Sequence, residues 1–349
     1  MTLEVLTPAE RLKALEWPKV EPVEQFSLAP SDWLVVCAGF EDRALAVLER
    51  AARSTNPFHV VLIVYKPVLD ENKEGECRRI CERARIQVIE LSYDRQEPVG
   101  FGSLLCETVS HCRGRIFVDV SGMSRLLITQ TLVALGTRPE GFKKCFVAYT
   151  EAAVYPPSQF DAEAELVKQD LDPTFSIQFL SSGVFGITVV PELSAWSMGG
   201  AQTRLIAFPS LDEHHLIALQ TELQPSRVSL IEGVPPGEQN RWRRDCIAKV
   251  NRLAEIRVAE RRQTSTLDYR ETLNCLLDLY ARHAIRERLL LAPTGSKMQT
   301  VAVGIFRTFV PDVQIVYPTP RGFRQPDDYT HGMGQMHRLS LEAFRLEDE

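Results

Sequence analysis

Two short turns in the sequence combine a glycine, hydroxyl side chains and a cation, which are residue types that bind phosphate. Residues 121–125 (Ser-Gly-Met-Ser-Arg) follow the apolar run 116–120, and residues 294–297 (Thr-Gly-Ser-Lys) follow the apolar run 289–292. A helix that begins directly after a buried strand presents unpaired backbone amides and the positive end of its dipole, and both favour an anion. Each turn is also compatible with a capped strand–helix connection that binds nothing.

The side chains of these turns suggest distinct roles in holding a phosphate ester. Gly122 and Gly295 would allow the backbone to approach a ligand oxygen. Arg125 would offer a planar, forked donor, and Lys297 would offer a point charge. Aromatic side chains after neighbouring strands would stack on bases, worth roughly 1–3 kcal/mol each, although they are equally suited to covering the sheet. These aromatic candidates are Tyr149, Tyr155, Tyr317 and Phe323.

The predicted ligand-binding set adds residues that the fold should bring to the same edge. Ligands of open α/β sheets bind at the carboxyl ends of the strands, where the strand order reverses. This rule adds residues 39–43 to the first site, and residues 210–214 and 317–323 to its counterpart. Arg43 has a structural alternative, which is an ion pair with a nearby glutamate. The full set is Gly39, Phe40, Arg43, Ser121, Gly122, Met123, Ser124, Arg125, Tyr149, Tyr155, Thr294, Gly295, Ser296, Lys297 and Tyr317.

Several common catalytic motifs do not occur in the sequence. It has no Walker A loop, no Gly-x-Gly-x-x-Gly dinucleotide fingerprint and no Gly-x-Ser-x-Gly nucleophile elbow. Asp119 lies inside a predicted strand, where it could act as a catalytic base or have a structural role. No catalytic residue is therefore assigned. Cys77 and Cys81 lack a second pair at ligand spacing, and His331 and His337 are expected to be solvated or in the core. We therefore predict no metal and no cofactor.

Alternating strands and helices must position these turns. Apolar runs predict strands at residues 33–37, 59–65, 86–91, 116–120 and 145–149 in one part, and at 204–208, 227–232, 289–292 and 313–317 in another. Strands with nearly unbroken apolar runs are typical of parallel sheets covered on both faces. The predicted fold class is therefore α/β, with two Rossmann-like, doubly wound and mostly parallel sheets.

The order of elements repeats, which indicates an internal duplication. Each turn is followed by another strand that ends in tyrosine, and each half opens with an apolar strand, a polar turn and a helix. We expect a leader at 1–31, a first Rossmann-like half at 32–157, a connecting segment at 158–203 and a second half with a C-terminal tail at 204–349. Within the connection, residues 183–188 and 198–200 are expected to be loop and turn.

Composition limits the class of function. The chain has 349 residues, a formal net charge of −6, 44% hydrophobic residues and eight cysteines without a paired framework. An acidic chain is a poor general binder of duplex DNA. Its apolar runs are too short to span a bilayer, and the N-terminus has no signal-peptide pattern. These features suggest a cytoplasmic protein that does not bind membranes.

The turns and their flanking elements resemble the CARF domains of prokaryotic defence proteins, and two such halves in one chain resemble the SAVED arrangement. The resemblance covers roughly residues 32–157 and 204–324. It implies that the two turns contact the phosphates of a cyclic oligonucleotide signal and that paired halves form one composite pocket. Members of these families usually carry an effector module, and none is visible here. The resemblance therefore also implies a separate effector protein or a homo-oligomer as partner.

Three functions follow as hypotheses. The leading one is a sensor that binds a nucleotide second messenger, possibly a cyclic oligonucleotide, in antiviral defence. The second is a metal-independent phosphodiesterase that degrades such a signal, with candidates Ser121, Ser124, Arg125, Lys297 and Asp119. The third is a non-catalytic interaction subunit of a defence complex, in which both turns are empty.

Overall fold

The computed structural model describes residues 6–53, 57–172, 183–195, 202–252, 258–322 and 329–345. The chain divides into two compact units. The first unit comprises Pro18–Pro156 and Gln325–Glu349. The second unit comprises Met1–Trp17 and Pro157–Arg324. Phe323, a candidate for stacking, lies outside the described residues. The same holds for the turn predicted at residues 198–200.

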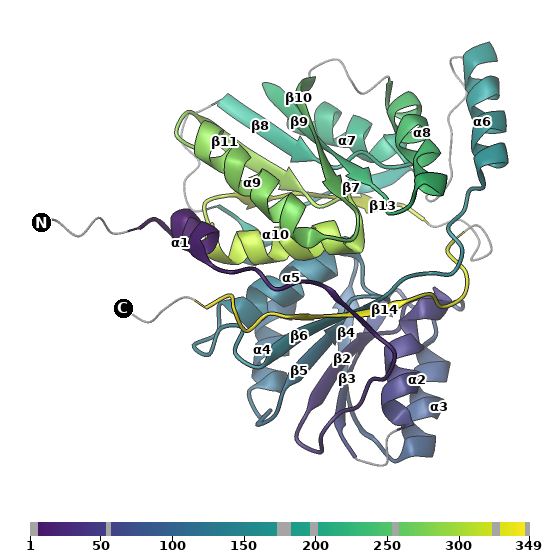
Figure 1. Cartoon of the computed structure of the whole chain (residues 1–349), viewed down its shortest axis with the longest axis vertical. Coiled ribbons are helices and arrows are strands. Elements are labelled where there is room, and N and C mark those ends of the chain that lie inside the picture. Colours follow the sequence, from purple (N-terminus) through teal and green to yellow (C-terminus); the bar gives the residue numbers. More distant parts are fainter. Residues whose placement is uncertain are drawn as a thin grey trace, which may run out of the picture. The chain divides into compact units, whose positions relative to one another are not determined.

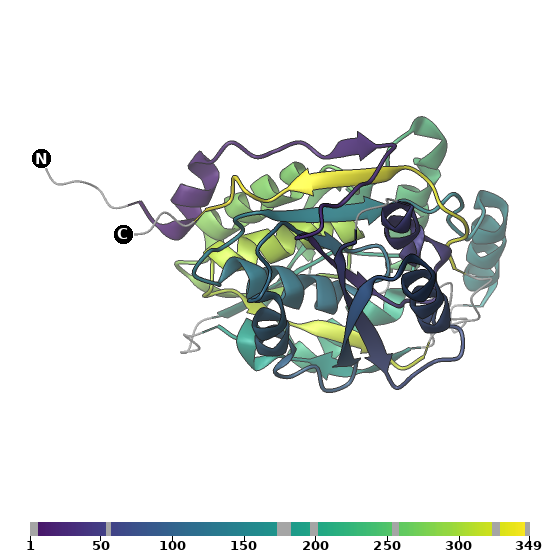
Figure 2. The same cartoon turned by 90° about the horizontal axis from the view of Figure 1, so that it is seen from below.

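The first unit is built on a sheet of seven strands among the described residues (Figures 1 and 2). Its order is β1 (Glu21–Val23), β14 (Met336–Ser340), β6 (Cys145–Thr150), β5 (Ile116–Asp119), β2 (Trp33–Cys37), β3 (His59–Lys66) and β4 (Gln87–Asp94). The strands from β6 to β4 are parallel, whereas β14 pairs antiparallel with both β6 and β1.

Helices cover both faces of this sheet (Figure 1). They are α2 (Ala46–Ala52) and α3 (Glu74–Ala84) on one face, and α4 (Phe101–Val109) and α5 (Arg125–Gly136) on the other, with the short helix η1 (Asp42–Ala44) before α2. The unbroken apolar run of β3 fits this arrangement, because residues 60–65 are all buried.

The second unit has a parallel sheet of five strands within the described residues. Its order is β10 (Val258–Ser265), β9 (Arg227–Val234), β8 (Gln202–Ala207), β11 (Glu287–Ala292) and β12 (Gln314–Ile315). A separate pair joins β7 (Val184–Thr188) and β13 (Tyr317–Pro320). Its helices are α1 (Pro8–Ala14), α6 (Gln159–Leu171), η2 (Pro191–Leu193), α7 (Glu213–Leu223), η3 (Glu238–Asn240), α8 (Trp242–Val250), α9 (Tyr269–His283) and α10 (Lys297–Phe309).

The parallel parts of the two sheets have the same topology. Numbered along the chain within each unit, both read 3-2-1-4-5, the strand order of a Rossmann fold. This confirms the predicted fold class of two doubly wound, mostly parallel sheets. The shared strand order is what an internal duplication would produce, and the duplication itself stays a prediction.

Three segments differ from the expectation. Residues 183–188, expected to be a loop, form β7 because the backbone of β13 pairs with them. The tail, which we grouped with the second half, supplies β14 of the first sheet. The N-terminal helix α1 groups with the second unit, where it contacts α9 and α10.

His337 is 7% exposed and stacks on Tyr149, which agrees with a core role.

A buried carboxylate ties the amino end of β2 to that of β5. Asp32, 2% exposed, accepts hydrogen bonds from the Arg115 guanidinium at 2.6 and 3.1 Å and from the backbone of Ala29 at 2.8 Å. Burial raises the pKa of Asp32, but the hydrogen bonds and charge of Arg115 outweigh it and hold the pKa below its usual value.

We predict an acid-dependent loss of stability from this carboxylate. A group with a depressed folded pKa stabilises fully above its unfolded pKa, about 3.9 for Asp, and loses that contribution as pH falls through the folded value. Urea unfolding between pH 7 and pH 3 should show Asp32→Asn about 1.5–3 kcal/mol less stable than wild type at pH 7, because a charged hydrogen-bond acceptor is lost. The difference between the two proteins should begin to narrow below about pH 4, and a difference that stays constant down to about pH 3 would contradict this account.

Candidate functional site

The first turn lies at the switch point of its sheet. β2 and β5 are neighbours, and their connections leave towards opposite faces, so the segments after both strands meet at the carboxyl edge. A Cβ added at Gly39 would lie 2.7 Å from the Gly122 carbonyl oxygen, and one at Gly122 would lie 2.3 Å from the Cys37 carbonyl oxygen. Both positions therefore require glycine because two chain segments pack together. This reason differs from the predicted approach of a ligand to Gly122.

The deepest residues of the first turn are committed to the protein interior. Ser121 is fully buried; its amide donates to Asp119 Oδ1 at 2.9 Å, and its Oγ accepts the Thr150 amide at 2.8 Å. Met123 is 1% exposed. The Asp119 side chain therefore faces the turn and stabilises it. The structure thus gives Ser121, Asp119 and Met123 structural contacts.

Tyr65 supports the same turn, and the sequence analysis missed it. Its hydroxyl accepts the Ser124 amide at 2.5 Å and donates to the Gly122 carbonyl at 3.3 Å. The Arg95 guanidinium lies 4.1 Å from the centre of the ring. Burial is the main cause that raises the pKa of Tyr65, so the hydroxyl stays protonated. Its position near the end of a buried strand, beside the switch point, is the feature of the sequence that could have indicated this role.

We expect Tyr65→Phe to destabilise the first unit. The change leaves the Ser124 amide without its acceptor, a cost of about 1–3 kcal/mol for a buried polar group. Urea denaturation of both proteins measures it. Tyr280→Phe is the matched control, because it removes a partly exposed hydroxyl that bonds Asp312 at 2.8 Å and should cost less. Equal stability of Tyr65→Phe and wild type would show that the hydroxyl does not hold the turn.

The end of the first turn is the part that faces outward. Ser124 caps α5 by accepting the Leu127 amide at 3.2 Å, and Arg125 is the first residue of the helix. Ser124 and Arg125 are both partly exposed, unlike the three residues before them. Solvent therefore reaches the helix N-terminus at these two side chains.

Arg43 lies in a buried polar cluster beside the first turn. It is 6% exposed, pairs with Glu41 at 2.7 Å and donates to the Tyr149 hydroxyl at 3.3 Å. Its guanidinium also lies 5.8 Å from the centre of the Tyr155 ring. The ion pair with Glu41 confirms the structural alternative for Arg43. Tyr149, 8% exposed, serves the same cluster.

Segments of the tail complete this edge of the first unit. The Gly332 amide donates to Asp42 Oδ2 at 3.0 Å, and the Thr330 hydroxyl donates to Glu41. Tyr329 meets Phe40 edge to face at 4.7 Å between ring centres. Phe40 is partly exposed and is packed on a ring of its own unit.

The second turn has the same layout with different partners. Thr294 is 3% exposed, and its hydroxyl donates to the Phe208 carbonyl at 2.7 Å. Ser296 caps α10 in a capping box: its Oγ accepts the Gln299 amide at 3.1 Å, and Gln299 Oε1 accepts the Ser296 amide at 2.8 Å. Lys297 is the first helical residue and is partly exposed. Gln299 therefore accepts the amide of the N-cap residue of α10, as Tyr65 accepts the amide of the N-cap residue of α5.

Gly295 of the second turn and Tyr317 of β13 also have interior roles. A Cβ at Gly295 would lie 2.5 Å from Gln299 Oε1 and 3.0 Å from the Phe208 ring. Tyr317 is 7% exposed within β13, so its ring is not available for stacking.

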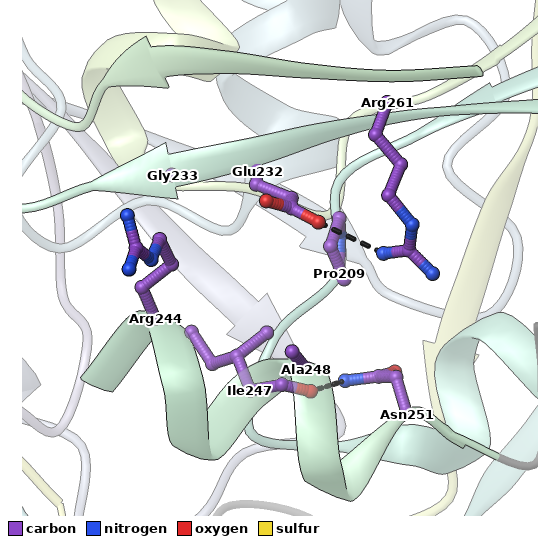
Figure 3. Close-up of a pocket in the computed structure, with 8 residues that line it drawn as sticks. All are labelled: Pro209, Glu232, Gly233, Arg244, Ile247, Ala248, Asn251 and Arg261. Carbon is purple, nitrogen blue, oxygen red and sulfur yellow. Dashed lines mark hydrogen bonds and ion pairs between the residues drawn. The ribbon is translucent and has the colours of Figure 1, made fainter. Parts of the chain in front are cut away.

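A pocket that the sequence analysis missed lies near residues 210–214 (Figure 3). Its volume is about 10 Å³, room for about one water molecule, and it is lined by Pro209, Glu232, Gly233, Arg244, Ile247, Ala248, Asn251 and Arg261. Glu232 and Arg261 pair across it at 2.8 Å, and Asn251 Nδ2 donates to the Ser210 carbonyl at 2.7 Å. Nearby, a hydrogen bond that the Asp212 carboxylate accepts from the His214 ring is the main cause that raises the pKa of His214.

The described residues contain no group of three or more His, Cys, Asp or Glu side chains placed to hold a metal ion. Cys77 and Cys81 are buried free thiols, and burial raises the pKa of both. None of the helices described here combines the length and apolarity needed to cross a membrane.

Comparison with known proteins gives no family for the chain. No protein-family model matches it, and no curated protein matches it. The cytoplasmic domain of a prokaryotic cation chloride cotransporter is 10% identical over 84% of this chain and 97% of its own, with a TM-score of 0.23. Phosphoethanolamine N-methyltransferase 1 of Haemonchus contortus is 10% identical, covers 82% and 72%, and has a TM-score of 0.20. A ketoreductase domain from the bacillaene assembly line is 12% identical, covers 86% and 70%, and has a TM-score of 0.18. TM-scores this low carry no argument about function.

Proposed function

We propose that the protein is a sensor that binds a nucleotide signal, with phosphates held at the N-termini of α5 and α10. Cyclic oligonucleotides and a role in antiviral defence enter through the resemblance to CARF and SAVED proteins. Both helices start at the switch point of a Rossmann-like sheet, where such folds bind their ligands. A single pocket shared by both turns stays a prediction.

The observation that carries the proposal is a cation at the first residue of each of these helices. Arg125 opens the 12-residue α5 and Lys297 the 13-residue α10, and neither helix has an acidic residue in its first turn. A positive side chain at the positive end of a helix dipole is unfavourable, by about 0.3–1 kcal/mol at an exposed site. A bound anion would turn this repulsion into two attractions. That the arrangement occurs at both switch points favours phosphate binding over simple capping.

The structure narrows the predicted contact set. Ser121 and Thr294 hold backbone groups of their own unit, as do Gly122 and Gly295 through close packing. The side chains that remain at the surface of the turns are Ser124 and Arg125 in the first unit and Ser296 and Lys297 in the second. The Ser296 hydroxyl donates to the Thr266 carbonyl at 2.7 Å, so we assign phosphate contacts to Ser124, Arg125 and Lys297 only.

A thermal-shift screen tests the proposal. Linear and cyclic oligonucleotides should be compared with mononucleotides and inorganic phosphate. A ligand present at 100 times its Kd stabilises the folded protein by about 2.7 kcal/mol, which is a clear rise in Tm. A folded protein with no shift for any member would count against nucleotide binding.

Two other functions remain as alternatives. The hydroxyls of Ser121 and Thr294 bond backbone groups of their own unit, which favours an interaction subunit whose turns bind no ligand. A metal-independent phosphodiesterase is less supported, because Asp119 already binds the Ser121 amide. Incubation of the protein with each bound nucleotide, followed by mass spectrometry, separates enzyme from sensor: cleavage products identify the enzyme, and intact ligand identifies the sensor.

A further inference from the structure

Helix α6 has an apolar face on each side. Ala162 and Leu166 are buried and form a hydrophobic cluster with Cys246 and Val250 of α8, the helix beside it in Figure 1. This contact holds α6 on the second unit. It accounts for one side of the helix only.

The other side of α6 exposes a stripe of apolar residues. Phe160 is 79% exposed, Val167 57% and Leu171 82%, and Ala164 between them is also exposed. Successive members are four, three and four residues apart, which is the d-a-d-a spacing of a coiled-coil seam. The buried Ala162 and Leu166 then occupy f and c positions, which point away from such a seam. A stripe of this kind in water marks an interaction site.

We propose that this stripe binds α6 of a second copy of the chain, in an antiparallel pair related by two-fold symmetry. A two-fold contact requires a self-complementary surface. In this arrangement Phe160 faces the partner's Leu171, and Ala164 faces the partner's Val167, so large residues meet at the ends and smaller ones at the centre. At one flank Lys168, which also pairs with Glu165 of its own helix at 2.6 Å, lies opposite the partner's Asp161, so opposite charges meet there twice. At the other flank Glu163 lies opposite the partner's Asp170, a carboxylate that each chain neutralises with its own Arg252 at 2.5 Å. The inference does not depend on nucleotide binding.

Charge also argues against a membrane as the occupant. The helix carries Asp161, Glu163, Glu165 and Asp170 against Lys168 alone. Amphipathic helices that bind membranes are rich in Lys and Arg on their polar face. The contact between two 13-residue helices is short. It falls at the small end of specific interfaces, so we expect a dissociation constant in the micromolar range.

Sedimentation equilibrium of the full chain tests the proposal. Wild type should show a monomer–dimer equilibrium between about 1 and 300 µM, and Val167→Glu should raise the dissociation constant at least ten-fold. Ile285→Glu is the matched control, because Ile285 is 92% exposed and lies outside α6. It should behave as wild type. Circular dichroism confirms that each variant is folded, and Leu171→Gln serves as a second probe of the seam.

A charge exchange tests the antiparallel register. Lys168→Asp should weaken the dimer, and adding Asp161→Lys should restore it, because the double variant exchanges the two charges. A chain that is monomeric at 300 µM would overturn the proposal, as would a dimer that Val167→Glu and Leu171→Gln leave unchanged. A monomeric chain that binds anionic vesicles through this face would assign the stripe to a membrane instead.

Discussion

Arg43→Ala should lower the free energy of unfolding by about 3–5 kcal/mol. The guanidinium is buried and neutralises Glu41, and removal of one partner leaves the other charge uncompensated in the interior. Burial lowers the pKa of Arg43, but the charge of Glu41 more than offsets this and holds the pKa above its usual value. Tyr149 and Tyr155 also lose the cation that they surround. Urea denaturation followed by circular dichroism measures the loss.

Arg79→Ala is the control for this prediction. Arg79 pairs with Glu76 at 3.4 Å, and its side chain is 68% exposed, so its loss should change stability by less than about 1 kcal/mol. If Arg43→Ala kept wild-type stability and lost nucleotide binding, Arg43 would be a ligand contact, as the sequence first suggested, and the cluster would belong to the site.

Arg125→Ala should show the opposite behaviour, with binding lost and stability kept. Loss of a charge-assisted contact to phosphate costs about 1.5–3 kcal/mol, which is roughly ten-fold or more in affinity. Lys297→Ala should cost less, because a planar fork binds phosphate through two hydrogen bonds and an ammonium acts as a point charge. Both variants should melt near the wild-type Tm, because each cation is partly exposed at a helix N-terminus.

Isothermal titration of a nucleotide that binds the wild type measures this difference. Arg113→Ala is the control, since Arg113 is an exposed arginine of the first unit outside the turn. It should bind as wild type. If Arg125→Ala instead unfolded the protein while residual binding stayed unchanged, Arg125 would be structural, and the assignment of the first turn would be wrong.

Local patterns explain why most of the architecture was predictable. The run at residues 59–65 is apolar on both faces, which is typical of a covered parallel strand, and β3 spans all of it. β7 and β14 were missed because partners distant in sequence define them. β7 is short and contains Gly186, and β14 pairs with β6 more than 180 residues earlier. The local sequence of neither segment predicts a strand.

For the candidate site too, some features could be predicted from the sequence and others depend on contacts made only in the folded chain. The turns, their glycines and the helices after them follow from the order of residue types along the chain. The partners of their hydroxyls do not, because Thr150 and Phe208 are reached only through the folded sheet. The same holds for Tyr65, 59 residues before the amide that it accepts. The sequence therefore located the turns, and only the structure separated Arg125, which faces outward, from Ser121, which does not.

Isothermal titration of the wild-type protein with cyclic and linear oligonucleotides tests the central claim most directly. We predict saturable binding of at least one oligonucleotide, with an affinity that falls as salt is added because phosphate charge is recognised. The same ligand should bind Arg125→Ala roughly ten-fold or more weakly. A folded wild-type protein that gives no heat of binding with any member, at concentrations up to the millimolar range, would contradict nucleotide recognition by these turns.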